Sequence, residues 1–154
     1  LETPTEGILF SLMGVFIVSL TLYTLFAAIQ FWRQSDQLKP THKEAIFTGM
    51  IIFVVASFIG GVMSGMMSHN VGGAMGEEGL QFVNWSTKYG DLRVAHFIGL
   101  HALQLVPIVG FFLAGYLADE KSSLLATRIF GLLYALVVVG TFVQAMMGLP
   151  LVGS

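Results

Sequence analysis

The 154-residue sequence contains no cysteine and few charged residues. The absence of cysteine excludes disulfide bonds and thiolate metal sites. Charged residues make up 10% of the chain, whereas soluble domains have about 25%. The net charge of −2 lacks the basic excess of nucleic-acid-binding proteins, so we expect no nucleic acid partner. No P-loop, hydrolase elbow or pair of carboxylates marks a catalytic site, which favours a subunit over a stand-alone enzyme.

Apolar residues dominate instead, at 55% of the chain with a mean hydropathy of +0.81. A chain this short cannot hide so much apolar surface from water, so we infer that lipid surrounds it. Four apolar runs exceed the roughly 20 helical residues that cross a bilayer. Four strands could not close a barrel. The sequence therefore predicts one all-α membrane domain, 1–154, with spans at about 7–32, 45–68, 92–118 and 129–151.

Lysine and arginine are distributed unevenly between the predicted loops. Five lie in the first and third loops, namely Arg33, Lys39, Lys43, Lys121 and Arg128, and two lie elsewhere, namely Lys88 and Arg93. The positive-inside rule therefore places the first and third loops in the cytoplasm. Both termini and the long loop 69–91 are expected on the outer, non-cytoplasmic side. The first run is too long for a signal-peptide core, so we expect a retained span.

Small residues recur every four positions along the second predicted span, at Ser57, Gly61 and Gly65, and the row ends at His69. Such rows let two helix backbones approach closely in a membrane. The row therefore predicts helix packing. A sharper alternative is a groove that admits a flat cofactor or a helix of another subunit.

Four polar residues lie within one short part of the third predicted span, at Arg93, His96, His101 and Gln104. On an α-helix they fall within one arc of about 140°. Because ionisable groups are costly against lipid, we expect this arc to face the interior of the bundle. Asp91 is expected to cap the helix and to pair with Arg93.

The positions along the predicted helices indicate two polar layers. The outer layer would contain His69, His96 and Arg93, and the inner layer His101, Gln104 and Gln144. A purely structural interpretation is that these groups hydrogen-bond to one another. We interpret His42, which follows Pro40 in a polar loop, as a solvated residue without a role.

Histidines at similar depth on neighbouring helices favour a b-type haem or related tetrapyrrole. His69 and His96 are the predicted iron ligands, Arg93 would lie near a propionate, and His101 is an alternative ligand. A second hypothesis is a cofactor-free accessory subunit. A third is copper, because six methionines lie in the outer half, namely Met63, Met66, Met67, Met75, Met146 and Met147. Proton or solute passage is less favoured because the spans lack Asp and Glu.

The segment 84–104, NWSTKYGDLRVAHFIGLHALQ, resembles a motif, NWS…GDLR.AHF.GLHALQ, of a family of small four-span bacterial membrane proteins. The resemblance implies a bacterial inner membrane and one ordered unit of loop and third span. A remoter resemblance is to haem-A-synthase-type four-helix bundles, in which histidines near the outer face bind haem. We therefore expect a small haem-binding subunit of an electron-transfer complex. Its expected partners are lipids and either other membrane subunits or further copies of the chain.

Overall fold

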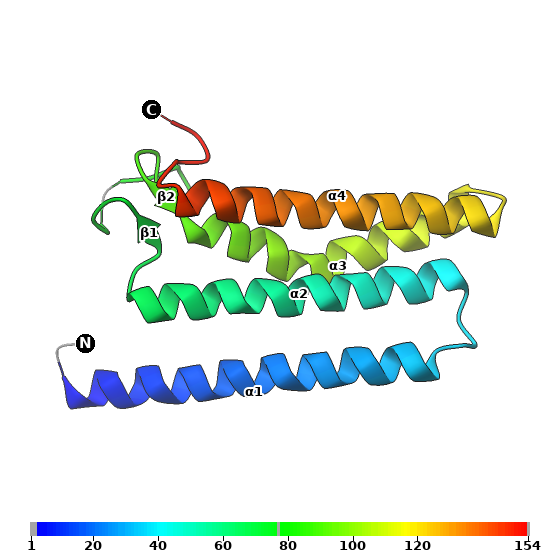
Figure 1. Ribbon diagram of the computed structural model, residues 1–154, viewed down its shortest axis with the longest axis horizontal. Helices are drawn as coiled ribbons and strands as arrows, with labels where there is room; N and C mark the ends of the chain where they lie inside the picture. Colours follow the sequence, from blue (N-terminus) through cyan, green and yellow to red (C-terminus); the bar gives the residue numbers. More distant parts are fainter. Residues whose placement is uncertain (1–2, 77, 154) are drawn as a thin grey trace.

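The computed structural model describes residues 3–76 and 78–153 and contains four long helices that run alternately up and down (Figure 1). The helices are α1 (Pro4–Gln34), α2 (Pro40–Met66), α3 (Leu92–Tyr116) and α4 (Glu120–Met146). Each is long and apolar enough to cross a membrane. The predicted fold, an all-α bundle of four membrane-spanning helices, is thereby confirmed, and the chain is a multi-pass membrane protein.

Capping residues set the ends of the helices. The Asp119 side chain accepts a hydrogen bond from the backbone N–H of Ser122, so α4 starts at Glu120 rather than near 129. At the other end α4 stops at Met146, before Gly148 turns with a φ of 75°. Helix α2 stops at Met66 because Met67 adopts a left-handed conformation. The apolar runs thus located the spans, but local caps shifted their boundaries.

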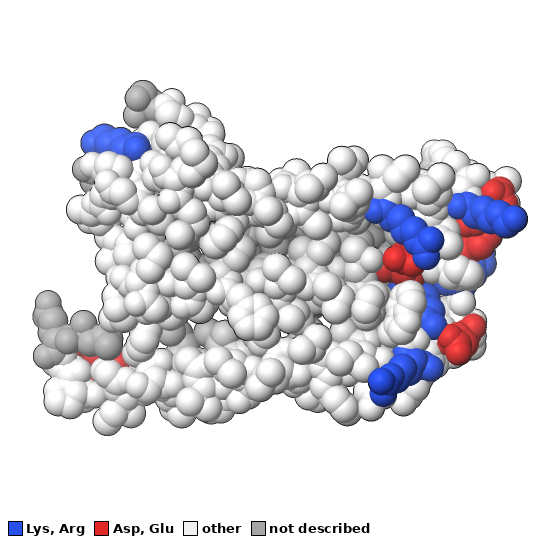
Figure 2. Space-filling view, viewed as in Figure 1, with Lys and Arg blue, Asp and Glu red and all other residues white. Residues whose placement is uncertain are grey.

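The two ends of the bundle differ in structure and charge. Both termini and the long connection 67–91 lie at one end, here called the terminal end (Figure 1). The short connections 35–39 and 117–119 lie at the other end, here called the charged end. Most charged side chains in view gather there, and a broad uncharged belt separates the two ends (Figure 2). This distribution suits a protein whose middle is surrounded by lipid.

Helices α2, α3 and α4 pack closely because small residues line the core face of α3. A Cβ added to Gly99 would collide with Ala56 of α2, and one added to Gly110 would collide with Ala45. Pro107 lies inside α3, where it removes a backbone donor and bends the helix in its middle (Figure 1). Gly49 of α2 packs against this bend, where a Cβ would lie 2.7 Å from the Ala102 carbonyl oxygen.

Helix α1 is peripheral and packs against α2 near the charged end. Its described buried residues are Thr21 and Ala28. Trp32 contacts Phe47 with 4.6 Å between ring centroids. Towards the terminal end α1 is less buried, since residues 11–20 are all exposed.

Polar contacts join α2 and α4 at the charged end. Glu120 accepts hydrogen bonds from both the backbone N–H and the hydroxyl of Thr41, at 2.8 and 2.7 Å. This carboxylate therefore caps the start of α2, whose own N-cap residue Lys39 makes no side-chain cap. Arg128 also pairs with Glu44 at 2.9 Å. The order of the helices is thus fixed at this end by side chains that reach between helices.

The glycine contact between α2 and α3 yields a stability prediction. Gly49→Ala should destabilise the protein by about 2 kcal/mol, because the added methyl group must displace the α3 backbone. Gly61→Ala is the matched control, since a Cβ there meets nothing within 4 Å. Thermal unfolding in mild detergent measures both variants. Equal melting temperatures for the two variants would contradict the packing described here.

Candidate functional site

Asp91 organises the terminal end of the bundle. It belongs to a short antiparallel pair in which β1 (Asn70–Val71) lies beside β2 (Gly90–Asp91), with Asn70 opposite Asp91. The side chain of Asp91 is fully buried. Its carboxylate accepts hydrogen bonds from the backbone N–H groups of Ser86, at 2.9 Å, and of Arg93, at 3.0 Å. One carboxylate therefore both caps α3 and holds the long connection.

Arg93 supplies the charge that compensates Asp91. Its guanidinium Nη2 lies 2.7 Å from Asp91 Oδ2 and also donates to the Asn84 carbonyl oxygen at 2.5 Å. Burial alone would raise the pKa of Asp91, but the hydrogen bonds from Arg93 and Ser86 outweigh it and hold that pKa below its usual value. The expected cap and ion pair are thus both present.

His69 lies in the long connection, three residues beyond the end of α2. Its Nδ1 is 2.9 Å from Asn70 Oδ1 and 3.7 Å from Asp91 Oδ1. Its backbone carbonyl accepts from the N–H of Leu92 at 2.9 Å. The residue therefore belongs to the Asp91 network.

His96 lies between α2 and α3. Its Nδ1 is 2.8 Å from the Ala56 carbonyl oxygen, and its ring packs on Gly60, where a Cβ would lie 2.9 Å from Cε1. Ala56 is ten residues before the end of α2, whereas His69 lies beyond that end. The two predicted iron ligands thus have different partners at different depths.

His101 and Gln104 do not face the interior, which corrects the expected direction of the polar arc. Both are exposed, whereas Ala95, Ala102 and Val106 on the opposite side of α3 are buried. The reason is that close packing in lipid uses small residues, so the alanine and glycine face turned inward. Phe97 lies beside His101 with 4.2 Å between ring centroids, and Trp85 lies 5.7 Å beyond Phe97.

One face of α3 is consequently exposed along its length, with ring contacts at its edges from Trp85 to Phe97 and from His42 of α2 to Phe111. We call it the open face of α3. Its members are all exposed and are Phe97, His101, Gln104, Ile108, Phe111 and Gly115. Gln104 makes no side-chain hydrogen bond to any described residue.

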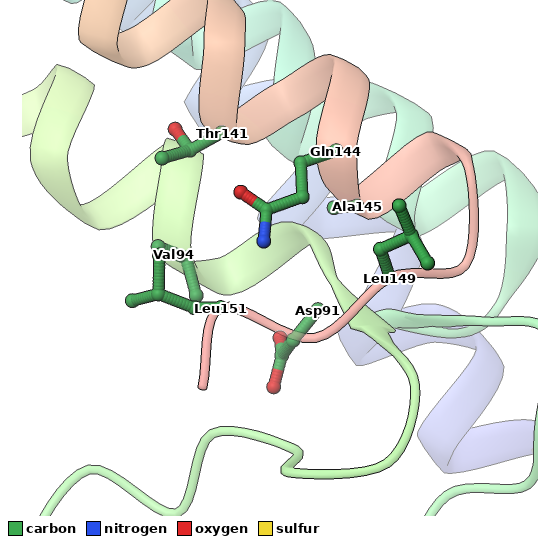
Figure 3. A pocket seen from close by; sticks show the side chains of 7 residues that line it. All are labelled: Asp91, Val94, Thr141, Gln144, Ala145, Leu149 and Leu151. Carbon is green, nitrogen blue, oxygen red and sulfur yellow. The ribbon is translucent and has the colours of Figure 1, made fainter. Parts of the chain in front are cut away.

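Gln144 lies at the terminal end rather than beside His101 and Gln104. It lines a cavity of about 10 Å³ together with Asp91, Val94 and Thr141, and its amide points into the space between α3 and α4 (Figure 3). The amide also donates to the Pro150 carbonyl oxygen at 2.6 Å. The proposed inner layer is therefore not assembled, because α4 ends earlier than expected and Gln144 falls near its last turn.

The small-residue row of α2 is only partly packed. Ser57 is buried and donates to the Phe53 carbonyl oxygen, whereas a Cβ on Gly61 or Gly65 would meet nothing within 4 Å. The contacts between α2 and α3 use Gly49 and Gly60 instead.

The three histidines share one chemical feature. In each, Nδ1 faces an oxygen that only accepts, so Nδ1 carries the proton; the acceptors are Asn70 Oδ1, the Ala56 carbonyl and the Phe97 carbonyl. The Nε2 lone pair is left available, as in histidines that ligate metals. Within 3–76 and 78–153, however, no three His, Cys, Asp or Glu side chains gather into a metal cluster. An imidazole with a free Nε2 is a type of group that binds haem iron as an axial ligand.

Two further expectations concern methionine and His42. Five of the six methionines, namely Met66, Met67, Met75, Met146 and Met147, are exposed, and Met63 is partly buried against the core. His42 lies in the first turn of α2 and stacks on Phe111 of α3, with 4.1 Å between ring centroids. It is half-buried and not the solvated loop residue that the sequence suggested.

The sequence interpretation missed Asn70 and Ser86 as parts of the terminal network. Asn70 bonds His69 and the Ala74 carbonyl oxygen, and the Ser86 hydroxyl accepts from the N–H of Tyr89. The only signal was the motif around Asp91, because a buried aspartate requires several donors.

Comparison of the chain with protein-family models, curated proteins and solved structures finds no match.

The Asp91 network predicts a stability change at the terminal end. Asp91→Asn keeps a capping side chain but removes the charge that compensates Arg93, so we expect a loss of about 2 kcal/mol. Because the folded-state pKa of Asp91 is depressed, its contribution is complete above the ordinary pKa of 3.8 and is lost as the pH falls below it. Thermal unfolding at pH 7 and under acid measures both effects.

Asp119→Asn is the matched control, because Asp119 caps α4 in an exposed position without an ion pair among the described residues. It should change the melting temperature much less than Asp91→Asn. Similar losses in both variants would show that capping, and not the ion pair, stabilises the terminal end.

Proposed function

We propose that this chain is a small subunit of a larger assembly in a bacterial inner membrane. Its terminal end faces outward, as the distribution of lysine and arginine favours. It joins its partner through the open face of α3. The observation that carries this proposal is the exposure of His101 and Gln104 on a helix that crosses the membrane.

The depth of His101 and Gln104 in the membrane makes their exposure to lipid energetically costly in an isolated chain. At about 1.5 Å per residue, His101 lies about 14 Å and Gln104 about 18 Å along α3 from Leu92. Both are therefore near the middle of a hydrocarbon layer about 30 Å thick. An unsatisfied polar group there costs several kcal/mol, and the Gln104 side chain is too short to reach the interface.

Other exposed polar residues in the spans support the same conclusion by contrast. The hydroxyls of Ser11, Ser19 and Thr24 each donate to a carbonyl oxygen four residues earlier in α1. These groups are satisfied within their own helix and need no partner. Gln104 and the Nε2 atom of His101 have no such partner among the described residues, which supports an external one.

Removing both polar groups should disrupt the assembly. The variant with His101→Leu and Gln104→Leu should weaken association about tenfold or more, since hydrogen bonds between membrane helices contribute about 1 kcal/mol each. The measurement is particle mass after extraction in mild detergent or native nanodiscs. Ser19→Ala with Thr24→Val is the matched control and should leave the mass unchanged. A wild-type protein that runs as a monomer would contradict the proposal.

A second candidate is a b-type haem or related tetrapyrrole in an electron-transfer complex. The protonated Nδ1 atoms of His69, His96 and His101 support it, because each ring presents a free Nε2. The cavity beside Gln144, of about 10 Å³, and an apolar groove of about 200 Å³ between α2 and α4 are smaller than typical cofactor pockets of about 300–1,000 Å³. The ring would therefore lie against the outside of the bundle, shared with a partner.

An absorption spectrum of gently extracted protein tests the haem candidate. A Soret band that disappears in His69→Ala, His96→Ala or His101→Ala, and persists in His42→Ala, would support axial ligation by the lost imidazole. A protein that copurifies with its partner but shows no Soret band would exclude haem and leave the subunit proposal intact.

A further inference from the structure

The open face of α3 has the spacing of a two-helix interface. Its members follow one another at intervals of four, three, four, three and four residues, from Phe97 to Gly115. Hydrophobic residues at alternating intervals of three and four form the contact stripe of left-handed helix pairs. The same geometry is common between membrane helices.

The polar pair on this face is complementary to itself. The Nδ1 atom of His101 donates to the Phe97 carbonyl oxygen at 2.7 Å, so in the neutral imidazole the Nε2 atom accepts a hydrogen bond. The Gln104 amide carries two donors. In a symmetric pair of parallel helices, residues at these two neighbouring positions of the stripe lie beside each other across the interface. Gln104 of each copy would then donate to His101 of the other.

The rest of the face suits the same contact. Phe97, Ile108 and Phe111 are 48%, 49% and 53% exposed, so they hold apolar area still to be buried. After Arg93, α3 contains no charged residue, so like charges would not oppose each other along a two-fold axis. All copies of a membrane protein cross the bilayer in the same direction, which makes α3 parallel to its symmetry mate.

We propose that the open face of α3 binds a second copy of this chain, with two symmetric hydrogen bonds between Gln104 and His101. The inference rests on the proposed function, in that it names the partner of the same face. A second copy is favoured because donor and acceptor occur within one turn of one helix. The polar pair fixes the register of the two helices, as single polar residues do in coiled coils.

Cysteine crosslinking in native membranes tests the proposal, because the wild-type sequence contains no cysteine. Ile108→Cys and Phe111→Cys should form disulfide-linked dimers of this chain under mild oxidation. Phe112→Cys is the matched control, since Phe112 is 67% exposed but lies off the open face. We expect about fivefold less dimer from the control, because disulfides require Cα atoms within about 7 Å. His101→Leu with Gln104→Leu in the Ile108→Cys background should reduce the crosslink to the control level.

The outcomes separate the two proposals. One outcome is that Ile108→Cys gives no self-crosslink while the particle stays larger than a monomer and its size depends on His101 and Gln104. In that case the proposal that the partner is a second copy is wrong, and the proposal that the open face of α3 binds a partner stands. If the particle is a monomer, both proposals are wrong. Equal crosslinking at Ile108 and Phe112 would indicate random collision and overturn the interface.

Discussion

The close approach of the α2 and α3 backbones is the constraint on which the rest of the structure depends. A Cβ on Gly49 would collide with the Ala102 carbonyl oxygen, and Gly99 and Gly110 leave room only for the alanines opposite them. In lipid, where apolar side chains gain nothing by leaving the solvent, such contacts decide which face of a helix turns inward. Once the small residues occupy the core, the polar residues on the other side of α3 have to point outward.

The same constraint separates three histidines that are near one another in the sequence. His69 bonds to the buried network around Asp91, His96 bonds to the α2 backbone, and His101 lies open on α3. Their Nδ1 atoms are engaged alike, but their Nε2 atoms meet different surroundings. The terminal end is thus held by the ion pair of Asp91 and Arg93, whereas the middle of α3, on which the proposed docking face rests, is exposed.

Much of the fold could be predicted from the sequence, because four long apolar runs leave few alternatives in a membrane. The ends of the helices could not, since Met67 acts through a left-handed backbone conformation and Asp119 through a side-chain cap, and hydropathy measures neither. For the candidate site, the capping and pairing of Asp91 and Arg93 could be read from local spacing. The direction of His101 and Gln104 was predicted wrongly, because the cost of exposing a polar group was weighed without the competing gain from packing glycines and alanines.

Helix α1 meets α2 through Trp32, and its buried residues are Ala28 and Thr21, whereas residues 11–20 are all exposed. In a bilayer, the exposed side chains of residues 11–20 would lie against lipid tails or against another protein. The buried core cluster consists of residues of α2, α3 and α4, so the first span could change its neighbours without opening that core.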